Sequence, residues 1–295
     1  KNLKNNKIIM FMYNSFRKIL TLISPKTTSK LNYKMTFGEN LNLKNPKGFN
    51  EKLMYIRIYN YDKNPLVWKC SDKYELREYA LSCGLTKENF PKLYGVYNNA
   101  KEIDFSKFPD KFALKCSHGC GFNFICTDKN KIDENKVRKL LNKWKRENFG
   151  LISAETQYLH SKKYIYCEEY IENEKNEFPM DYKIYCFNGK AKLVLVCSER
   201  KEKTRLNFFD LDWNELMIGK PDYRSNKKLK KPERLEEMIN LAEKLSIPFP
   251  FVRIDFYEYK GNVILGEMTF TPAANCAQYY TKDGNLFLGD MLEIE

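Results

Sequence analysis

The 295-residue sequence predicts an α+β fold built mainly from antiparallel hairpins, and three observations support this prediction. Asn188-Gly189 separates two strand-like runs, and this dipeptide is the strongest short signal for a hairpin turn. A second pair of strand-like runs meets at 260–262, where the chain reads Lys-Gly-Asn. Helical patterns do not alternate with single strands along the chain, which argues against a doubly wound parallel sheet.

Helices are predicted where apolar residues recur every three or four positions. In 49–59, for example, Phe49, Leu53 and Ile56 share one face of the expected helix. The other segments with this pattern are 8–24, 72–81, 136–148 and 232–245.

Strands are predicted where apolar and polar residues alternate or short apolar runs are bounded by turn residues. The segment 112–126 reads as a strand, a glycine-containing turn at 117–121 and a second strand. The other predicted strands are 92–96, 164–170, 181–187, 190–197, 251–259 and 263–270.

Most of the positive charge lies at the start of the chain. The net charge is +13, and eight cations precede Glu39, the first acidic residue, which leaves five charges for the rest. Nucleic-acid binding is therefore not expected, because it calls for basic charge over the folded surface. As a helix, 8–24 is basic and amphipathic, which suits contact of residues 1–30 with an anionic membrane surface. The alternative is a helix packed on the body of the protein.

The cysteine pattern indicates a cytoplasmic protein. The nine cysteines form no Cys-x-x-Cys pair and there are only two histidines, so a zinc site made of these residues is not expected. An odd number of cysteines within apolar runs is typical of reduced, buried thiols. No run of about 20 apolar residues, the length of a membrane span, is present. We expect a cytoplasmic location, with any membrane contact peripheral and on the inner face.

The last predicted hairpin carries the strongest chemical signal. With a three-residue turn centred on Gly261, Tyr259 pairs with Val263 and Asp255 lies opposite Glu267. Two facing carboxylates repel, and a Mg²⁺ ion held by them and by substrate phosphates would compensate the repulsion. Strand alternation adds two further polar side chains to this face, Arg253 and Thr269. The alternative is an exposed sheet face with an Arg253–Glu267 ion pair.

Two further segments resemble parts of a nucleotide site. Lys115 precedes a Gly-x-Gly turn between two strands, whose backbone N–H groups could fold over phosphates, although an ordinary turn explains it as well. His118 lies in the same turn, where it could equally be a bystander. An apolar strand ends in Glu168-Glu169, which could face an adenosine or simply be solvated.

In this order, the motifs resemble the ATP-grasp superfamily. The resemblance to its TupA-like branch, which is associated with teichuronopeptide and other surface polysaccharides, extends from about Phe49 to the C-terminus. It rests on the segments FALKCSHGCGFN, DYKIYCFNG, NFFDLDW, FPFVRIDFY and GEMTFTP. The sequence departs from the pattern at Thr269, where many members have asparagine, and at Phe122 in the glycine loop.

The resemblance implies an ATP-grasp fold, with a basic helical segment at 1–66, a part containing the small lobe at 67–170, and a C-terminal lobe with the metal site at 171–295. It also implies two cofactors, ATP and Mg²⁺, with Mn²⁺ as a substitute. The implied metal ligands are Asp255, Glu267 and Thr269. The implied ATP contacts are Lys73 and Lys115 on the phosphates, Ser117, His118, Gly119, Gly121 and Asn123 in the loop, Glu168, Glu169 and Ile171 at the adenine, and Asp181 at the ribose or the wall. The implied catalytic residues are Arg253 and Lys115, with Lys183, Arg200 and Arg205 near the acceptor.

This family implies a ligase that activates a carboxylate as an acyl phosphate and joins it to an amine. The branch suggests that an amino acid or peptide is attached to a uronic-acid carboxylate of a surface glycan or its precursor. Three alternatives are a phosphotransferase acting on a sugar or amino acid, a nucleotide-binding scaffold without catalysis, and a glycosyltransferase. The last would use Asp210-Leu-Asp212 as a metal motif, although this triplet is better explained as a turn.

Overall fold

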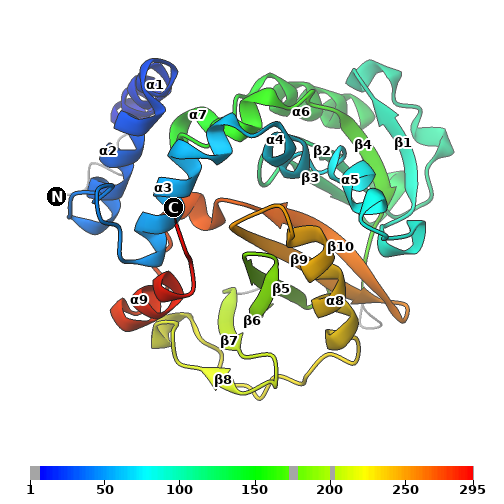
Figure 1. The fold of residues 1–295 in the computed structure, drawn as a ribbon. Coiled ribbons are helices and arrows are strands. Elements are labelled where there is room, and N and C mark those ends of the chain that lie inside the picture. Colours follow the sequence, from blue (N-terminus) through cyan, green and yellow to red (C-terminus); the bar gives the residue numbers. More distant parts are fainter. Residues whose placement is uncertain (1–6, 173–178, 200–202, 295) are drawn as a thin grey trace.

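A computed structural model describes residues 7–172, 179–199 and 203–294. Two antiparallel sheets, with helices packed around them, form this part of the chain (Figure 1). The small sheet has the strand order β1-β4-β2-β3, and the large sheet has the order β10-β9-β5-β6-β7-β8. The predicted α+β class is therefore confirmed.

The predicted strands are all present, with bounds that differ by at most one residue. The small sheet contains β1 (Leu93–Tyr97), β2 (Phe112–Cys116), β3 (Asn123–Cys126) and β4 (Ile165–Glu169). The large sheet contains β5 (Asp181–Phe187), β6 (Lys190–Ser198), β7 (Arg205–Phe209), β8 (Glu215–Leu216), β9 (Phe251–Tyr259) and β10 (Asn262–Thr269).

The α-helices of the described chain are α1 (Lys7–Ile23), α2 (Pro25–Phe37), α3 (Phe49–Tyr59), α4 (Pro65–Ser71), α5 (Leu76–Ser82), α6 (Glu134–Arg146), α7 (Gly150–Ser153), α8 (Leu235–Ser246) and α9 (Lys282–Asp290). One prediction needs correction, because the expected helix at 72–81 starts only at Leu76. The carboxylate of Asp72 accepts hydrogen bonds from the N–H groups of Tyr74 and Glu75, at 2.9 and 3.0 Å, and holds a turn there. Lys73 therefore lies in a turn and not on a helix.

The two predicted hairpins differ in how closely they follow the prediction. The turn at Asn188-Gly189 has both residues at positive φ, as a two-residue hairpin requires. In the last hairpin Tyr259 pairs with Asn262, so the predicted three-residue turn is wrong by one residue. An irregularity between Leu265 and Glu267 then shifts the register back, and Glu267 does lie opposite Asp255.

The large sheet is buried on one face and shared between core and cleft on the other. Helix α8 covers the first face, where Cys186 lies beside Ser246. On the second face, Phe49 of α3 makes an edge contact with Phe251 at a centroid distance of 5.0 Å. Arg253 follows Phe251 on this second face, two residues along β9. The charged part of the sheet therefore begins where the aromatic core ends.

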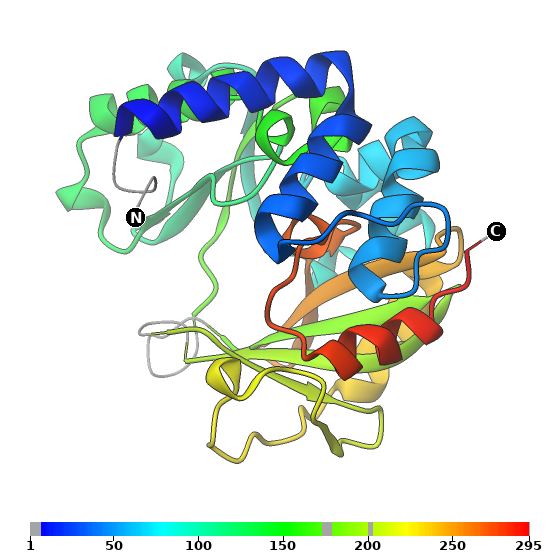
Figure 2. The ribbon, with the colours of Figure 1, turned by 90° about the vertical axis from the view of Figure 1, so that its left-hand side faces the viewer.

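Helices α1 and α2 lie on the outside of the molecule (Figure 2). They are attached to α7, where the Thr21 hydroxyl donates to the carbonyl oxygen of Leu151 at 2.6 Å and the Asn32 amide to that of Ile152 at 3.3 Å. None of the helices in the described chain has the length and apolarity to cross a membrane.

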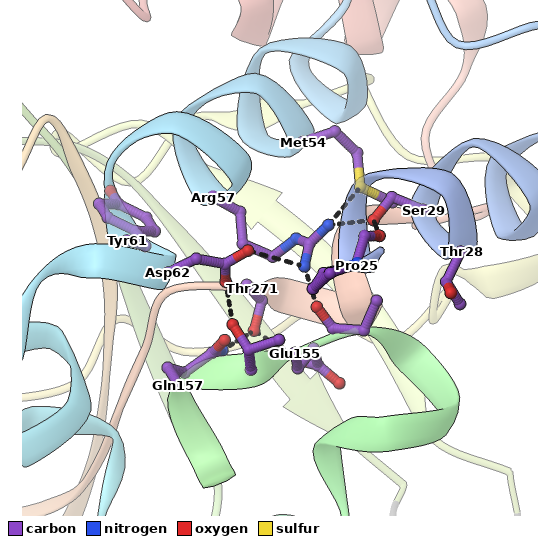
Figure 3. Close-up of polar contacts among 12 residues, drawn as sticks. Pro25, Thr28, Ser29, Met54, Arg57, Tyr61, Asp62, Glu155, Gln157 and Thr271 are labelled. Carbon is purple, nitrogen blue, oxygen red and sulfur yellow. Dashed lines mark hydrogen bonds and ion pairs between the residues drawn. The ribbon is translucent and has the colours of Figure 1, made fainter. Parts of the chain in front are cut away.

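A buried polar cluster joins these outer helices to the large sheet (Figure 3). The guanidinium of Arg57 donates to Ser29 of α2 and to the carbonyl oxygen of Ala154, and forms an ion pair with Asp62 at 3.5 Å. In the same cluster the hydroxyl of Thr271, two residues beyond β10, donates to the carboxylate of Glu155, two residues beyond α7. The cluster therefore holds the chain that leaves the charged hairpin.

We predict that Phe49→Ala lowers the free energy of unfolding by about 3–5 kcal/mol, because a fully buried ring is lost from an aromatic core. Leu81→Ala, at a side chain that is 44% exposed, is the control and should change the value by less than about 0.5 kcal/mol. Urea unfolding followed by circular dichroism measures both values. Equal effects of the two substitutions would contradict the packing described for α3.

Candidate active site

A cleft of about 470 Å³ separates the two sheets. The small sheet contributes β2, β3 and β4 to one wall, and the large sheet contributes β5, β9 and β10 to the other. Twelve of the predicted site residues line it: Lys73, Lys115, Gly121, Asn123, Glu168, Glu169, Ile171, Asp181, Lys183, Arg253, Asp255 and Glu267. Residues predicted from five separate segments therefore meet in one cavity.

The centre of the cleft is a cluster of buried charges on the large sheet. Lys183 lies opposite Asp255 on the neighbouring strand, and Asp255 lies opposite Glu267 on the next. The Lys183 ammonium contacts both Asp255 and Asp181, the latter at 2.7 Å. Burial alone would lower the pKa of Lys183, but these two carboxylates outweigh it and raise the pKa above its ordinary value.

Arg253 bridges the two carboxylates of the hairpin. Its Nε and one terminal nitrogen donate to the two oxygens of Asp255, both at 2.7 Å. The same terminal nitrogen lies 3.0 Å from the Thr269 hydroxyl and 3.4 Å from Glu267. Burial works against the charged form, yet Asp255 keeps the pKa of Arg253 well above its ordinary value. The guanidinium is therefore held rigidly at the cleft.

Lys73 reaches this cluster from outside the sheet. The turn that carries it is held by Asp72, which accepts a hydrogen bond from the Ser117 hydroxyl at 2.6 Å, and by the Lys73 N–H, which donates to the Ser117 carbonyl oxygen at 3.0 Å. The Lys73 ammonium lies 2.9 Å from Glu267 and donates to the carbonyl oxygen of Gly119 at 2.9 Å. Burial opposes its charge, but Glu267 raises the pKa of Lys73.

A second group of charges lies on the small sheet. Glu168 is nearly buried and contacts Lys115 and Arg77, each at 2.6 Å. The next carboxylate, Glu169, accepts hydrogen bonds from the Tyr259 hydroxyl on β9 and from Lys260 in the following turn, both at 2.9 Å. Two cations therefore compensate the charge of Glu168, whereas Glu169 links the small sheet to the large one.

Only part of the glycine loop, residues 117–123, lines the cleft. Gly119 and Gly121 have φ of 96° and 78°, which favour glycine, and Phe122 is anchored in the small-lobe core, where it stacks on Trp144. The side chains of Ser117 and His118 are fully buried and do not line the cleft. Their expected contact with the phosphates therefore stays a prediction, and it concerns the backbone of the loop.

The buried ring of His118 is bound to the end of α6. Its Nε2 lies 3.1 and 3.2 Å from the carbonyl oxygens of Trp144 and Glu147, at the end of α6. Burial lowers the pKa of His118 to about 4. The ring is therefore neutral at pH 7 and tethers the loop to α6.

The remaining predicted residues lie beside the cleft or away from it. Thr269 does not line the cavity, although its hydroxyl donates to Glu267 at 3.1 Å. Arg205 is directed elsewhere and donates to the carbonyl oxygen of Asp222 at 2.9 Å. Arg200 lies outside the described residues.

Several cleft residues were not predicted from the sequence. They are Leu76, Arg77, Phe90, Pro91, Ala113, Cys120, Ile125, Tyr166, Tyr170, Cys197, Thr204, Tyr257, Ile264, Leu265 and Gly266. Strand alternation could have found Tyr166 and Tyr257, since they lie two residues from Glu168 and Asp255 on the same faces. No sequence pattern points to Arg77, which reaches Glu168 from α5.

The donor set suits Mg²⁺. The candidate ligands Asp255, Glu267 and Thr269 offer only oxygen atoms. Within the described residues no three carboxylate, imidazole or thiol side chains are arranged to hold a metal by themselves. Two carboxylates completed by substrate phosphates are a usual way to hold Mg²⁺, so the residues fit this ion when ATP is present.

Asp210 occupies a turn between β7 and β8. Its two carboxylate oxygens accept hydrogen bonds from the backbone and side-chain nitrogens of Asn214, at 2.7 and 2.8 Å. Both oxygens thus stabilise the turn, and neither Asp210 nor Asp212 lines the cleft. The triplet closes a turn here, as the sequence favoured.

The model of the TupA-like ATP-grasp family matches residues 51–293 of this chain. No protein with curated annotation matches it. Solved structures similar in fold include D-alanine–D-alanine ligase from Bacillus anthracis, with 15% identity over 76% of this chain and 66% of that chain and a TM-score of 0.46. Another is the ATP-grasp ligase PsnB with its minimal precursor, with 8% identity over 82% of this chain and 67% of that chain and a TM-score of 0.45. D-alanine–D-alanine ligase from Helicobacter pylori has 16% identity over 77% of this chain and 62% of that chain, with a TM-score of 0.40. The chain thus spans about two thirds of the length of these proteins.

We predict that Gly119→Ala destabilises the protein more than Gly121→Ala. Both substitutions place a side chain at positive φ, which costs about 1–2 kcal/mol. At Gly119 the new Cβ would also lie 2.5 Å from the Phe149 ring, whereas at Gly121 nothing lies within 4 Å. We expect roughly 1–3 kcal/mol more for Gly119→Ala in chemical unfolding. A larger effect of Gly121→Ala would contradict this loop conformation.

We also predict that the stabilisation provided by Glu267 is lost in acid. Burial would raise its pKa, but Lys73, Lys183 and Arg253 outweigh burial and hold the pKa of Glu267 far below its ordinary value. The folded state thus binds this proton less readily than the unfolded chain, so the contribution is complete above about pH 4.5 and declines below it. The difference in unfolding free energy between wild type and Glu267→Gln should be constant from pH 7 to about 5 and shrink below about 4.5. A difference that grows in acid would contradict this charge arrangement.

Proposed function

Because the chain belongs to the TupA-like ATP-grasp family, we propose that its cleft binds Mg–ATP and joins a carboxylate to an amine. The family match confirms the resemblance predicted from the motifs. In this proposal residues 67–170 contain the small lobe and residues 171–295 form the C-terminal lobe with the metal site. We place the protein in the cytoplasm, where ATP is available and its thiols remain reduced.

The observation that carries the proposal is the set of compensated charges in the cleft. Lys73 and Lys115 each contact a carboxylate there, Glu267 and Glu168 respectively. Nucleotide phosphates offer these ammonium groups an alternative partner, and a divalent cation offers Glu267 one. Binding of Mg–ATP can thus exchange one set of counter-charges for another without leaving a buried charge unpaired. Mn²⁺ would take the place of Mg²⁺ in the same oxygen ligands.

Part of the cleft lining suits a nucleoside. Apolar and aromatic side chains belong to it, among them Phe90, Tyr166, Tyr257, Ile264 and Leu265. Residues Glu168 to Ile171 line the same cavity, and in this proposal their backbone groups contact the edge of the base. We therefore assign the adenine to these residues, next to the hydrogen bond between Glu169 and Tyr259, and assign the ribose to the side of Asp181.

The reaction then consists of two displacements. A carboxylate oxygen of the substrate attacks the γ-phosphorus of ATP, the bond to the β-phosphate oxygen breaks, and ADP and an acyl phosphate form. An amine nitrogen next attacks the acyl carbon, the bond to phosphate breaks, and an amide, phosphate and a proton are released. Mg²⁺, when bound, neutralises the phosphates. Arg253 donates to the transferring phosphoryl group and Lys115 to the phosphates, so catalysis is positioning and charge compensation.

For the substrates, we propose an amino acid or short peptide as the amine and a uronic-acid carboxylate of a surface polysaccharide or its precursor. The resemblance to the TupA-like branch, which is associated with surface polysaccharides, supports this choice. Lys183 is the candidate acceptor contact within the cleft, next to Asp255. Arg205 could serve only if it left its present partner, and Arg200 remains a proposal from the sequence.

We predict that Mg–ATP raises the melting temperature of the wild type, and that Glu267→Gln weakens this shift because a metal ligand is lost. Asp212→Asn also removes one carboxylate but lies outside the cleft, so it is the charge-matched control and should keep the wild-type shift. Differential scanning fluorimetry with a non-hydrolysable ATP analogue, with and without Mg²⁺, measures the effect. Stabilisation by UDP-sugars and not by Mg–ATP, sensitive to Asp212→Asn, would favour the glycosyltransferase alternative.

We further predict that steady phosphate release requires a carboxylate and an amine together, and that Arg253→Met lowers it at least about 100-fold. Phosphate release is measured in mixtures of uronic acids and amino acids, and mass spectrometry identifies the amide. ADP formation with a stable phosphorylated product and no amine requirement would instead identify a phosphotransferase. The Asp212→Asn variant controls for the general effect of a substitution.

A further inference from the structure

Helix α1 turns its apolar side away from the protein. Thr21 is buried against α7, and Arg17 is half-buried with its guanidinium over the Tyr13 ring. The large apolar side chains of the helix lie on the other side and are exposed: Phe11 73%, Met12 64%, Phe16 54%, Ile19 59%, Leu22 69% and Ile23 77%. At 100° per residue these six positions fall within an arc of roughly 140°. An ordinary surface helix packs its apolar face on the core, whereas α1 exposes its apolar face.

A cationic pocket lies beside this apolar face. It has a volume of about 560 Å³ and is formed between α1 and α6. Its cations are Lys18, Lys139, Lys143 and Arg146, none of which forms an ion pair with another described residue. Glu147 is the one acidic residue that lines it within the described chain. The three cations of α6 share one face of that helix, because they are spaced four and three residues apart.

Lys18 connects the two features. It lies three residues before the buried Thr21 and four before the exposed Leu22, so it stands at the edge between the attached and the apolar side of α1. Its side chain lines the pocket. Figure 2 shows α1 running along the outside of the molecule next to the α6 and α7 region. Apolar surface and unpaired positive charge are therefore adjacent on one face.

We propose that this face binds an anionic phospholipid bilayer, with the apolar side of α1 among the acyl chains and the pocket on a lipid phosphate headgroup. A bilayer surface offers hydrocarbon and phosphate side by side, which matches the two features. A second copy of the chain is a poorer partner, because the segment before Glu39 carries eight cations and no acid and would repel itself. The proposal is independent of the ligase reaction.

The structure thereby extends the membrane contact expected for residues 1–30. That expectation rested on an amphipathic helix alone, which could equally have packed its apolar side on the body. The pocket adds α6, more than 100 residues away in sequence, to the binding surface. Because α1 has 17 residues and its apolar arc runs along its length, it would lie in the plane of the interface.

The test is co-sedimentation of the full chain with vesicles of phosphatidylcholine alone and with roughly 30% phosphatidylglycerol added. We expect wild type to bind only the anionic vesicles. Lys139→Glu combined with Lys143→Glu should weaken binding at least about tenfold. Phe16→Ser combined with Ile19→Ser should also weaken it about tenfold or more, through lost apolar burial. All four side chains are exposed, so folding should be preserved.

The control is Lys230→Glu combined with Lys231→Glu, which makes the same change in net charge at two exposed lysines. The segment that carries them precedes α8 and lies at the end of the molecule away from α1 (Figure 2). This variant should bind vesicles like the wild type. Equal binding to neutral and anionic vesicles, no binding, or equal losses in the control would overturn the proposal. So would a dimer that dissociates in the Phe16 variant, since a second copy would then cover α1.

The thermal shift with Mg–ATP separates this proposal from the ligase function. Neither the pocket variant nor the α1 variant touches the cleft, so both should keep the wild-type response to Mg–ATP. We expect both variants to lose vesicle binding and to retain ATP binding. If both variants still bound the vesicles, the membrane proposal would be wrong and the ligase proposal would be unaffected.

Discussion

The pairing of the cleft carboxylates with cations from three different elements is the constraint on which the cleft depends. Asp255 and Glu267 face each other on neighbouring strands, where two like charges would destabilise the hairpin. Lys183 comes from the adjacent strand and Lys73 from a turn outside the sheet. Because a buried charge without a partner is costly, the hairpin, β5 and the turn after α4 must come together for any of them to be stable. The same arrangement leaves the cations ready for phosphates.

The irregularity at Gly266 shows how closely this arrangement depends on the backbone. A two-residue turn alone would offset Glu267 from Asp255 by one position, which would place the two carboxylates on opposite faces. The extra residue restores the register, and glycine suits it because a Cβ there would lie 2.8 Å from the Tyr257 ring. The bulge thus places Glu267 opposite Asp255, and its glycine leaves room for the Tyr257 ring in the cleft.

The loop after β2 divides its residues between support and site. Ser117 and His118 face inward and tie the loop to Asp72 and to α6, while Cys120 and Gly121 line the cleft. Sequence reasoning assigned the whole loop to the phosphates, because a glycine-rich turn has no period from which side-chain direction can be read. In the strands, where alternation fixes the direction, the assignments of Lys115, Asp255 and Glu267 to one cavity agree with the structure.

The α+β class and the two hairpins follow from the sequence alone, because periods of 2 and 3.6 residues fix which side chains of an element share a face. Asp255 and Glu267 were expected to face each other from a turn that is one residue too long, and the irregularity before Glu267 restores that pairing. What covers each face depends on the tertiary structure. Whether the apolar side of α1 points inward or outward, and whether Arg77 reaches Glu168, depends on elements far away in the chain. A local pattern contains no information about such partners. The charge partners of the cleft and the exposed side of α1 therefore emerge only from the folded chain.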